Sequence, residues 1–213
     1  MEHQIIDAGL QFTRVLTPRT RTTAIVLHHR AGEGDVESIH RQHLSQGWAG
    51  IGYNFYIRLD GRIFLGRGWN NEGAHAGSSN DYNAKSIGIC FEGNYDVRKE
   101  MPEAQYNAGV WLIREGLKLF PTIIEILRHR DVSATACPGR YFPLEKMIQD
   151  ARVKEDVIMP EIKDINVKVG SVEVKGKQID DVTYVPLRAF WDAVEAVVDV
   201  TWSSEDGAAL EMK

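Results

Sequence analysis

The sequence predicts an α/β fold, in which a mixed central β-sheet is flanked by helices, followed by a small α+β domain. Three observations lead to this prediction. Short β-branched apolar runs alternate with segments of helical periodicity over roughly the first 150 residues. The tight-turn pair Asp60-Gly61 separates two of these runs, as in a hairpin. Beyond residue 156 both the apolar spacing and the charge balance change, which indicates a second domain.

The strand predictions rest on short apolar runs. Residues 23–29, Thr-Ala-Ile-Val-Leu-His-His, are too few and too β-branched for a helix, so they are predicted as a buried strand. Residues 53–59 and 62–66 flank Asp60-Gly61 and are predicted as a hairpin, because this pair supplies the positive φ angles of a tight turn. The same criteria predict strands at residues 86–91 and 123–127.

One long helix and two shorter ones are predicted between these strands. Apolar residues recur at steps of three and four along one face of residues 102–120, and Pro121 closes the segment because the residue before a proline disfavours helix. Residues 36–44 and 144–153 show the same spacing over shorter lengths. Strands interleaved with helices imply a sheet covered on its faces.

The chain is predicted to hold a first domain at residues 1–155, a linker at 156–164 and a small domain at 165–213. In the small domain we expect strands on either side of Gly170-Ser171, a helix over 186–197, and a hairpin formed by 198–202 and 209–212. From residue 156 onward there are 12 acidic and 6 basic residues, against 18 acidic and 19 basic before it. This charge asymmetry supports the division.

Composition excludes several classes of function. The net charge is −5 and no dense Lys/Arg cluster is present, so a nucleic-acid partner is not expected. No run approaches about 18 apolar residues, so no membrane span is expected. The N-terminal residues lack the basic and apolar regions of a secretion signal, so we expect synthesis in the cytoplasm or export by another route. With only Cys90 and Cys137 present, a disulfide framework is not expected.

Three residues could form a metal site at the rim of the sheet. His28 lies at the end of the first predicted strand, His129 follows the strand at 123–127, and Cys137 precedes a Pro-Gly turn. Two imidazoles and one thiolate are three zinc ligands, and they leave the fourth tetrahedral position for water, as in catalytic sites. By spacing alone, two hydrogen-bonded core histidines and a buried thiol explain the same residues equally well.

Seven short motifs in fixed order resemble those of a known family. They are Ile25-Val26-Leu27-His28-His29, Gly52-Tyr53-Asn54-Phe55, Asp60-Gly61-Arg62, Gly66-Arg67-Gly68-Trp69, Gly73-Ala74-His75-Ala76-Gly77, Ser86-Ile87-Gly88-Ile89 with Phe91-Glu92-Gly93, and His129-Arg130-Asp131 through Thr135-Ala136-Cys137-Pro138-Gly139. Over residues 20–150 the sequence resembles the type 2 N-acetylmuramoyl-L-alanine amidases, which include amidase-type phage lysozymes and animal peptidoglycan recognition proteins.

The resemblance implies a zinc amidase that acts on peptidoglycan. Its substrate bond is the amide between the lactyl group of N-acetylmuramic acid and the L-alanine of the stem peptide. The family's ligands for one zinc ion fall on His28, His129 and Cys137, and its active-site tyrosine falls on Tyr53. Thr135 occupies a position where several phage enzymes carry a catalytic lysine and other active members carry threonine. This difference bears on how the oxyanion is stabilised, and it leaves the metal ligands in place.

Four further residues are candidates beside the metal. His75 matches a family position that lines the substrate groove, and Asn83 is expected to border that groove. Trp69 is either a groove wall or part of the core. Glu92 ends a predicted strand and is a candidate general base if it reaches the metal-bound water; otherwise it ties down the turn that follows.

The leading functional prediction is an endolysin or autolysin. Lacking a recognisable secretion signal, it would reach the cell wall through a separate, holin-like membrane-permeabilising protein. The alternatives are a non-catalytic peptidoglycan-binding protein, disfavoured because such relatives typically lose the cysteine ligand, and a muropeptide-recycling amidase, which often carries aspartate there.

Residues 165–213 resemble the N-terminal domain of copper amine oxidases, but contain no His or Cys, so copper is not implied. We expect this domain to bind the wall or to mediate self-association.

Overall fold

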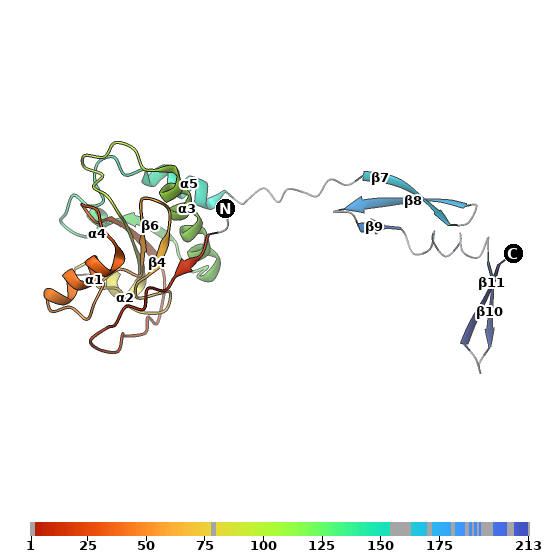
Figure 1. Ribbon diagram of the computed structural model, residues 1–213, viewed down its shortest axis with the longest axis horizontal. Coiled ribbons are helices and arrows are strands. Elements are labelled where there is room, and N and C mark those ends of the chain that lie inside the picture. Colours follow the sequence, from red (N-terminus) through yellow and green to blue (C-terminus); the bar gives the residue numbers. More distant parts are fainter. Residues whose placement is uncertain are drawn as a thin grey trace. The chain divides into compact units, whose positions relative to one another are not determined.

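The computed structural model describes residues 3–77, 80–153, 163–169, 172–179, 182–185, 188, 190, 192, 198–203 and 207–212. The chain divides into two compact units, residues 1–153 and residues 154–213 (Figure 1). Among the described helices, none combines the length and the apolar character that crossing a bilayer requires.

Six strands of the first unit form one sheet, in the order β1-β4-β3-β5-β2-β6. Their bounds are β1 (Ile5–Ile6), β2 (Ala24–His29), β3 (Phe55–Ile57), β4 (Ile63–Leu65), β5 (Ser86–Phe91) and β6 (Glu125–Arg128). Only β3 and β4 pair antiparallel, and the other neighbours are parallel. The predicted mixed central sheet is therefore confirmed.

Helices cover both faces of this sheet. They are α1 (Val36–Ser45), α2 (Tyr82–Lys85), α3 (Glu103–Leu119), α4 (His129–Val132) and α5 (Leu144–Arg152). The larger core cluster joins α3 and α5 to alternate residues of the central strands, such as Ile25 and Leu27 of β2. A smaller cluster joins α1 to the opposite face, where Tyr56 and Cys90 lie. The α1 side and the α3–α5 side can be followed in Figure 1.

The hairpin and the long helix match their sequence signals closely. Gly61 has φ of +85°, and the Arg58 amide donates to the Arg62 carbonyl across the turn (2.9 Å). Helix α3 begins and ends one residue inside the predicted segment 102–120. Strand β1 was not predicted, because a two-residue strand carries no measurable periodicity.

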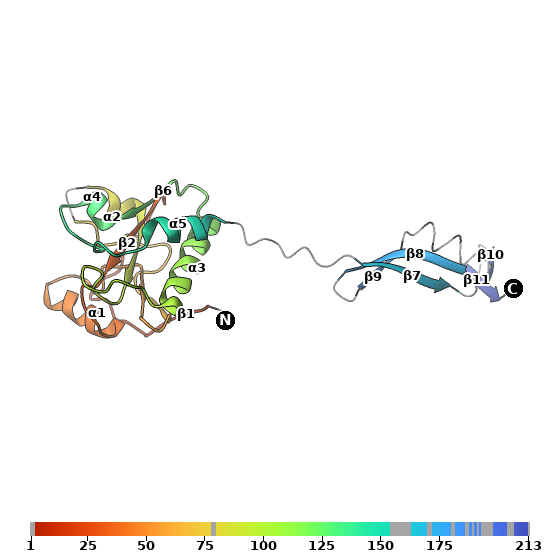
Figure 2. The same ribbon diagram turned by 90° about the horizontal axis from the view of Figure 1, so that it is seen from above.

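The second unit contains β7 (Lys163–Val169), β8 (Val172–Ile179) and β9 (Val182–Tyr184), which form an antiparallel sheet in that order (Figure 2). Strands β10 (Val198–Ser203) and β11 (Gly207–Met212) form the predicted hairpin. The last two residues of the predicted linker belong to β7. The rest of that linker, and most of the helix predicted at 186–197, lie outside the described residues.

Candidate metal centre

The ends of β2 and β6 bring two histidines to the same rim of the sheet. His28 is the fifth residue of β2, and His129 follows β6 directly as the first residue of α4. Because β2 and β6 are parallel neighbours, their carboxyl ends lie together, and the two imidazole centroids are 4.4 Å apart. Parallel pairing of strands about 100 residues apart in the chain thus creates the first half of the site.

The loop that carries Cys137, held by hydrogen bonds from Arg130, brings the third donor to this rim. Cys137 Sγ lies 3.9 Å from His28 Nδ1 and accepts a hydrogen bond from the His29 amide (3.4 Å). The Arg130 amide donates to the Cys137 carbonyl, and the Arg130 guanidinium donates to the carbonyl of Gly139 (2.9 and 2.8 Å). Gly139 has a φ of +98° and packs against the backbone of Tyr95. A Cβ at this position would lie 2.3 Å from the Tyr95 carbonyl carbon, so only glycine fits here.

The three donors fit a single metal ion. One ligand atom each from His28, His129 and Cys137 lies within 4.8 Å of the other two. Burial lowers the pKa of His28 well below its usual value and also lowers that of His129, so both imidazoles are neutral, as ligation requires. Burial raises the pKa of the Cys137 thiol to about 11, and a nearby cation would favour its thiolate.

Strand alternation separates the adjacent histidines. His28 lies in register with Cys90 of β5, on the α1 side of the sheet. The His29 ring turns the other way, and its Nδ1 accepts a hydrogen bond from the Tyr95 amide (3.0 Å). His28 therefore reaches the donor cluster with its side chain, whereas His29 contributes its backbone amide to Cys137.

Tyr53 lies beside the donor cluster, with its ring centroid 5.1 Å from that of His28. Burial, followed by the neighbouring Cys90 and Cys137 thiols, raises the pKa of Tyr53 well above its usual value. The phenol therefore remains protonated at neutral pH and can donate a hydrogen bond. The preceding residue, Gly52, packs closely on the backbone of Ala74, because a Cβ there would lie 2.3 Å from the Ala74 carbonyl oxygen.

An aromatic wall that the sequence did not reveal extends from Tyr53. The His43 ring lies 5.7 Å from that of Tyr53, and Trp48 stacks on His43 at 4.5 Å. His43 Nδ1 accepts a hydrogen bond from the Gly52 amide, and Trp48 is 39% exposed. The Gly-Trp pair that follows α1 is the only sequence signal for this wall, and it does not by itself show which way Trp48 faces.

His75 and Asn83 lie deeper than the sequence suggested. His75 is only 6% exposed, and its Nδ1 lies 3.0 Å from His28 Nε2. Burial lowers its pKa to about 3. Asn83 is partly buried, and its Oδ1 accepts from the His75 and Ala76 amides (2.7 and 2.9 Å) while its Nδ2 donates to the Gly77 carbonyl. His75 therefore contacts a candidate metal ligand directly, and Asn83 holds the backbone that carries His75.

The contacts of Trp69 and Thr135 are with the core and with the Cys137 loop, respectively. The Trp69 ring packs on the α3 side of the sheet, 4.3 Å from the Phe55 ring, so it belongs to the core alternative. Thr135 is exposed, and its Oγ1 accepts a hydrogen bond from the Cys137 amide (3.2 Å). The threonine thus supports the loop that carries the thiol.

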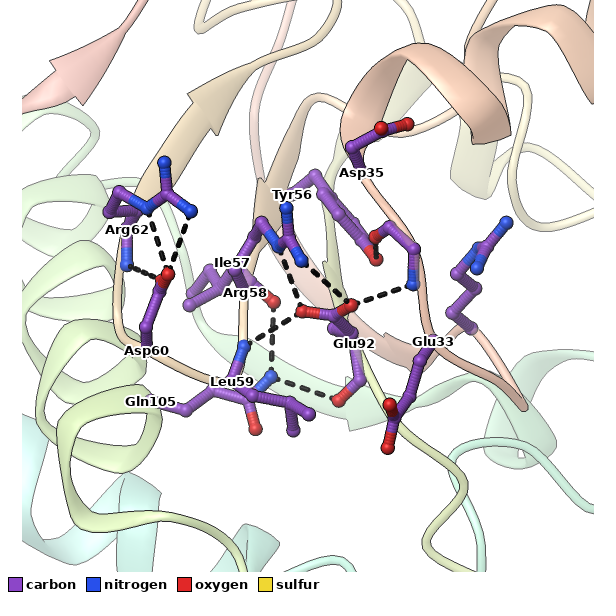
Figure 3. Close-up of polar contacts among 12 residues, drawn as sticks. Glu33, Asp35, Tyr56, Ile57, Arg58, Leu59, Asp60, Arg62, Glu92 and Gln105 are labelled. Carbon is purple, nitrogen blue, oxygen red and sulfur yellow. Dashed lines mark hydrogen bonds and ion pairs between the residues drawn. The ribbon is translucent and has the colours of Figure 1, made fainter.

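Glu92 is held in a structural network (Figure 3). Its carboxylate accepts hydrogen bonds from the Gly34 amide (2.7 Å), the Leu59 amide (3.0 Å) and Arg58 Nε (3.0 Å). The side chain is 2% exposed. Burial acts to raise the pKa of Glu92, but the hydrogen bonds outweigh burial and lower it. These contacts match the alternative in which Glu92 ties down neighbouring turns, because Gly34, Arg58 and Leu59 all lie outside the donor cluster.

We expect Glu92→Gln to lower stability and to spare catalysis. The substitution removes a charge that three donors share, so we expect a loss of about 1–3 kcal/mol in the free energy of unfolding. A general base would instead contribute about 10²–10⁴-fold to kcat. Urea unfolding and amidase kinetics on the same preparations separate the two roles. A loss of about 10²-fold in kcat would show that Glu92 acts as a general base.

The pH dependence of this effect follows from the lowered pKa. A carboxylate whose pKa falls on folding stabilises the protein above its unfolded pKa, about 4.3, and this stabilisation disappears as the pH falls through the folded value. The stability difference between wild type and Glu92→Gln should therefore shrink below about pH 4. Asp60→Asn is the matched control, because the Asp60–Arg62 pair is about half exposed and should contribute no more than about 1 kcal/mol.

A mixed sheet thus carries two imidazoles and one thiol at its rim, a donor set that could hold one metal ion. The chain belongs to the N-acetylmuramoyl-L-alanine amidase family, Amidase_2, whose match spans residues 18–140. The predicted family is thereby confirmed. The likeness of residues 165–213 to copper amine oxidases stays a prediction.

Relatives of two kinds are similar to this chain. The endolysin of Enterobacteria phage K11 is 32% identical over 151 residues, covering 67% of this chain and 93% of the phage protein. Peptidoglycan-recognition protein SC2 of Drosophila melanogaster is 39% identical over 126 residues, covering 54% of this chain. That match spans 66% of the Drosophila protein, just under two thirds.

Solved structures show the same fold. The N-acetylmuramoyl-L-alanine amidase LysC from Clostridium intestinale URNW superimposes with a TM-score of 0.66 at 33% identity. This superposition covers 72% of this chain and all of LysC. Drosophila PGRP-LB gives a TM-score of 0.59 at 29% identity, covering 66% of this chain and 91% of PGRP-LB.

Proposed function

We propose that this chain is a zinc-dependent N-acetylmuramoyl-L-alanine amidase. It would hydrolyse the amide between the lactyl group of N-acetylmuramic acid and the L-alanine of peptidoglycan, as an endolysin or an autolysin. The proposal rests chiefly on one observation: nitrogen atoms of His28 and His129 and the sulfur of Cys137 converge within 4.8 Å at the rim of the sheet. Similarity to a phage endolysin and to a bacterial amidase supports the same activity.

In this proposal His28, His129 and Cys137 hold one zinc ion. Bound zinc would lower the pKa of a coordinated water to about 7 and polarise the substrate carbonyl. The three donors are two neutral imidazoles and a half-buried thiol, a set that would suit a catalytic zinc ion.

The protein's own side chains would orient the amide beside this centre. The protonated Tyr53 hydroxyl would donate a hydrogen bond to the carbonyl oxygen as negative charge develops there. Thr135 would hold the Cys137 loop, since its hydroxyl accepts from the Cys137 amide. The exposed Trp48, stacked on His43, would flank the substrate outside the donor cluster.

The metal donor set favours catalysis over binding alone. Non-catalytic members of the family typically lack the cysteine, and here Cys137 meets both imidazoles. In a muropeptide-recycling enzyme we would expect aspartate in place of this thiol. We further propose that the second unit, residues 154–213, holds the enzyme on the wall or mediates self-association, and that a holin-like partner releases the enzyme to its substrate.

The test is metal analysis combined with detection of new amino termini. Purified protein should contain close to one zinc per chain, and its action on purified cell walls should free the amino group of L-alanine. Zinc removal by a chelator should stop this release, and added zinc should restore it. Wall binding without new L-alanine termini would instead favour the non-catalytic alternative. A truncated chain lacking residues 156–213 would show whether wall binding needs the second unit.

A further inference from the structure

The two ring nitrogens of His28 face different partners. Nδ1 lies 3.9 Å from Cys137 Sγ, on the side of the donor cluster. Nε2 lies 3.0 Å from His75 Nδ1, on the interior side. His28 is fully buried and His75 is 6% exposed, so water does not compete freely for this second contact. One of the two facing nitrogens must carry a proton, because two lone pairs would repel at this distance.

Metal binding would decide which nitrogen carries that proton. If His28 offers the lone pair of Nδ1 to a metal, its proton sits on Nε2 and points at His75. The Nδ1 atom of His75 is then the acceptor, and the His75 proton sits on Nε2. That atom is buried, and no hydrogen bond of standard geometry reaches it from the described residues.

The surroundings of His75 hold its ring in this position. The ring packs against two glycines, and a Cβ would lie 2.2 Å from it at Gly73 and 2.3 Å from it at Gly88. Asn83 Oδ1 accepts the His75 amide hydrogen bond (2.7 Å) and so fixes the backbone. A larger residue at either glycine would displace the imidazole. The close packing at these glycines holds the plane of the His75 ring, and in that plane Nδ1 lies within hydrogen-bond distance of His28 Nε2.

We propose that His75 is a positioning residue that orients His28 for zinc and fixes its proton on Nε2. The inference rests on the proposed zinc site and assigns His75 a role behind the metal, without contact to substrate. Partners of this kind typically change metal affinity by about 10–100-fold when they are removed. His75 would thus tune the affinity of the site for zinc.

The test compares two substitutions of similar shape. His75→Asn keeps an acceptor near the Nδ1 position, whereas His75→Leu removes it. We expect His75→Leu to weaken zinc binding by about 10–100-fold in a chelator competition, and His75→Asn to recover most of that loss. The absorption bands of the cobalt-substituted protein should shift in His75→Leu and return towards wild type in His75→Asn. Equal zinc affinity in wild type and His75→Leu would overturn the inference.

A second buried histidine supplies the matched control. His40 is 5% exposed and bonds to two backbone groups, the Ile51 amide and the Gln11 carbonyl, outside the donor cluster. His40→Leu should lower the melting temperature and leave zinc affinity unchanged. If it weakens zinc binding as much as His75→Leu does, the effect of His75→Leu is a general loss of stability and the inference fails.

A measurement on the wild-type protein covers the case in which His75→Leu does not fold. Nitrogen NMR of the zinc-loaded chain should show the His28 proton on Nε2, and a proton on Nδ1 would overturn the inference. Failure of the proposed function looks different, because wild-type protein would then either bind no zinc or bind zinc without releasing L-alanine termini, whatever residue stands at position 75.

Discussion

Replacing Cys137 with alanine is expected to weaken zinc binding by about 10²-fold and to abolish measurable amidase activity. The thiol is one of three protein donors that converge within 4.8 Å. Protein zinc sites bind with about 10–16 kcal/mol, so one ligand of four accounts for about 3 kcal/mol, or about 10²-fold in affinity. Because catalysis would need both the metal and its geometry, we expect turnover to fall at least as far. Zinc content and release of L-alanine termini are the measurements.

The second cysteine provides the control for this experiment. Cys90 is fully buried in β5 on the α1 side and packs with Tyr56 and Val36. Cys90→Ala should cost about 1 kcal/mol of stability through lost packing and leave zinc content at the wild-type level. The fold of Cys137→Ala should stay intact, because the sheet has its own core. If Cys137→Ala retains both zinc and activity, the proposed centre is wrong.

Replacing Tyr53 with phenylalanine is expected to lower kcat by about 10²–10³-fold while zinc stays bound, the usual effect of losing one donor to a developing oxyanion. The ring remains, so its packing at 5.1 Å from His28 is kept, and only the hydroxyl is lost. The raised pKa of Tyr53 means that wild type holds this proton throughout the neutral range. Kinetics at saturating substrate, with zinc content measured in parallel, separate a loss of chemistry from a loss of metal.

Tyr56→Phe is the matched control for this substitution. Tyr56 lies three residues after Tyr53 in the chain, and its hydroxyl donates a hydrogen bond to the Gly34 carbonyl (2.6 Å). Its loss should cost about 1 kcal/mol of stability and change kcat little. If Tyr53→Phe and Tyr56→Phe have the same kinetic effect, the Tyr53 hydroxyl does not act on the substrate.

Local signals account for most of the elements and for the order of the motifs. Periodicity over residues 102–120 predicts α3, and Asp60-Gly61 predicts the β3–β4 turn, because each signal depends on a few neighbouring residues. Strand alternation also predicts that His28 and His29 diverge, and the contact between His29 and the Tyr95 amide agrees with it. The two-residue strand β1 has no such signal.

The roles of the supporting side chains depend on contacts that are distant in sequence. Glu92 meets the Gly34 amide 58 residues away, and His75 meets His28 47 residues away. A sequence motif shows that these residues occur in the family's order, but it does not show whether a side chain faces solvent, core or metal. For this reason the expectation that His75 and Asn83 border the substrate groove stays a prediction, and the structure adds their contacts to His28 and to the backbone at His75 and Ala76.

By itself, the sequence determined the mixed α/β class, the family and the three residues that could bind a metal, because short-range periodicity, turn chemistry and ordered motifs are properties of the chain. Only the tertiary structure decided that the atoms of those residues meet, and which groups Glu92, Asn83 and Trp69 contact. The physical reason is strand order. Strand β2 lies between β5 and β6, and that pairing fixes which distant loops share the rim.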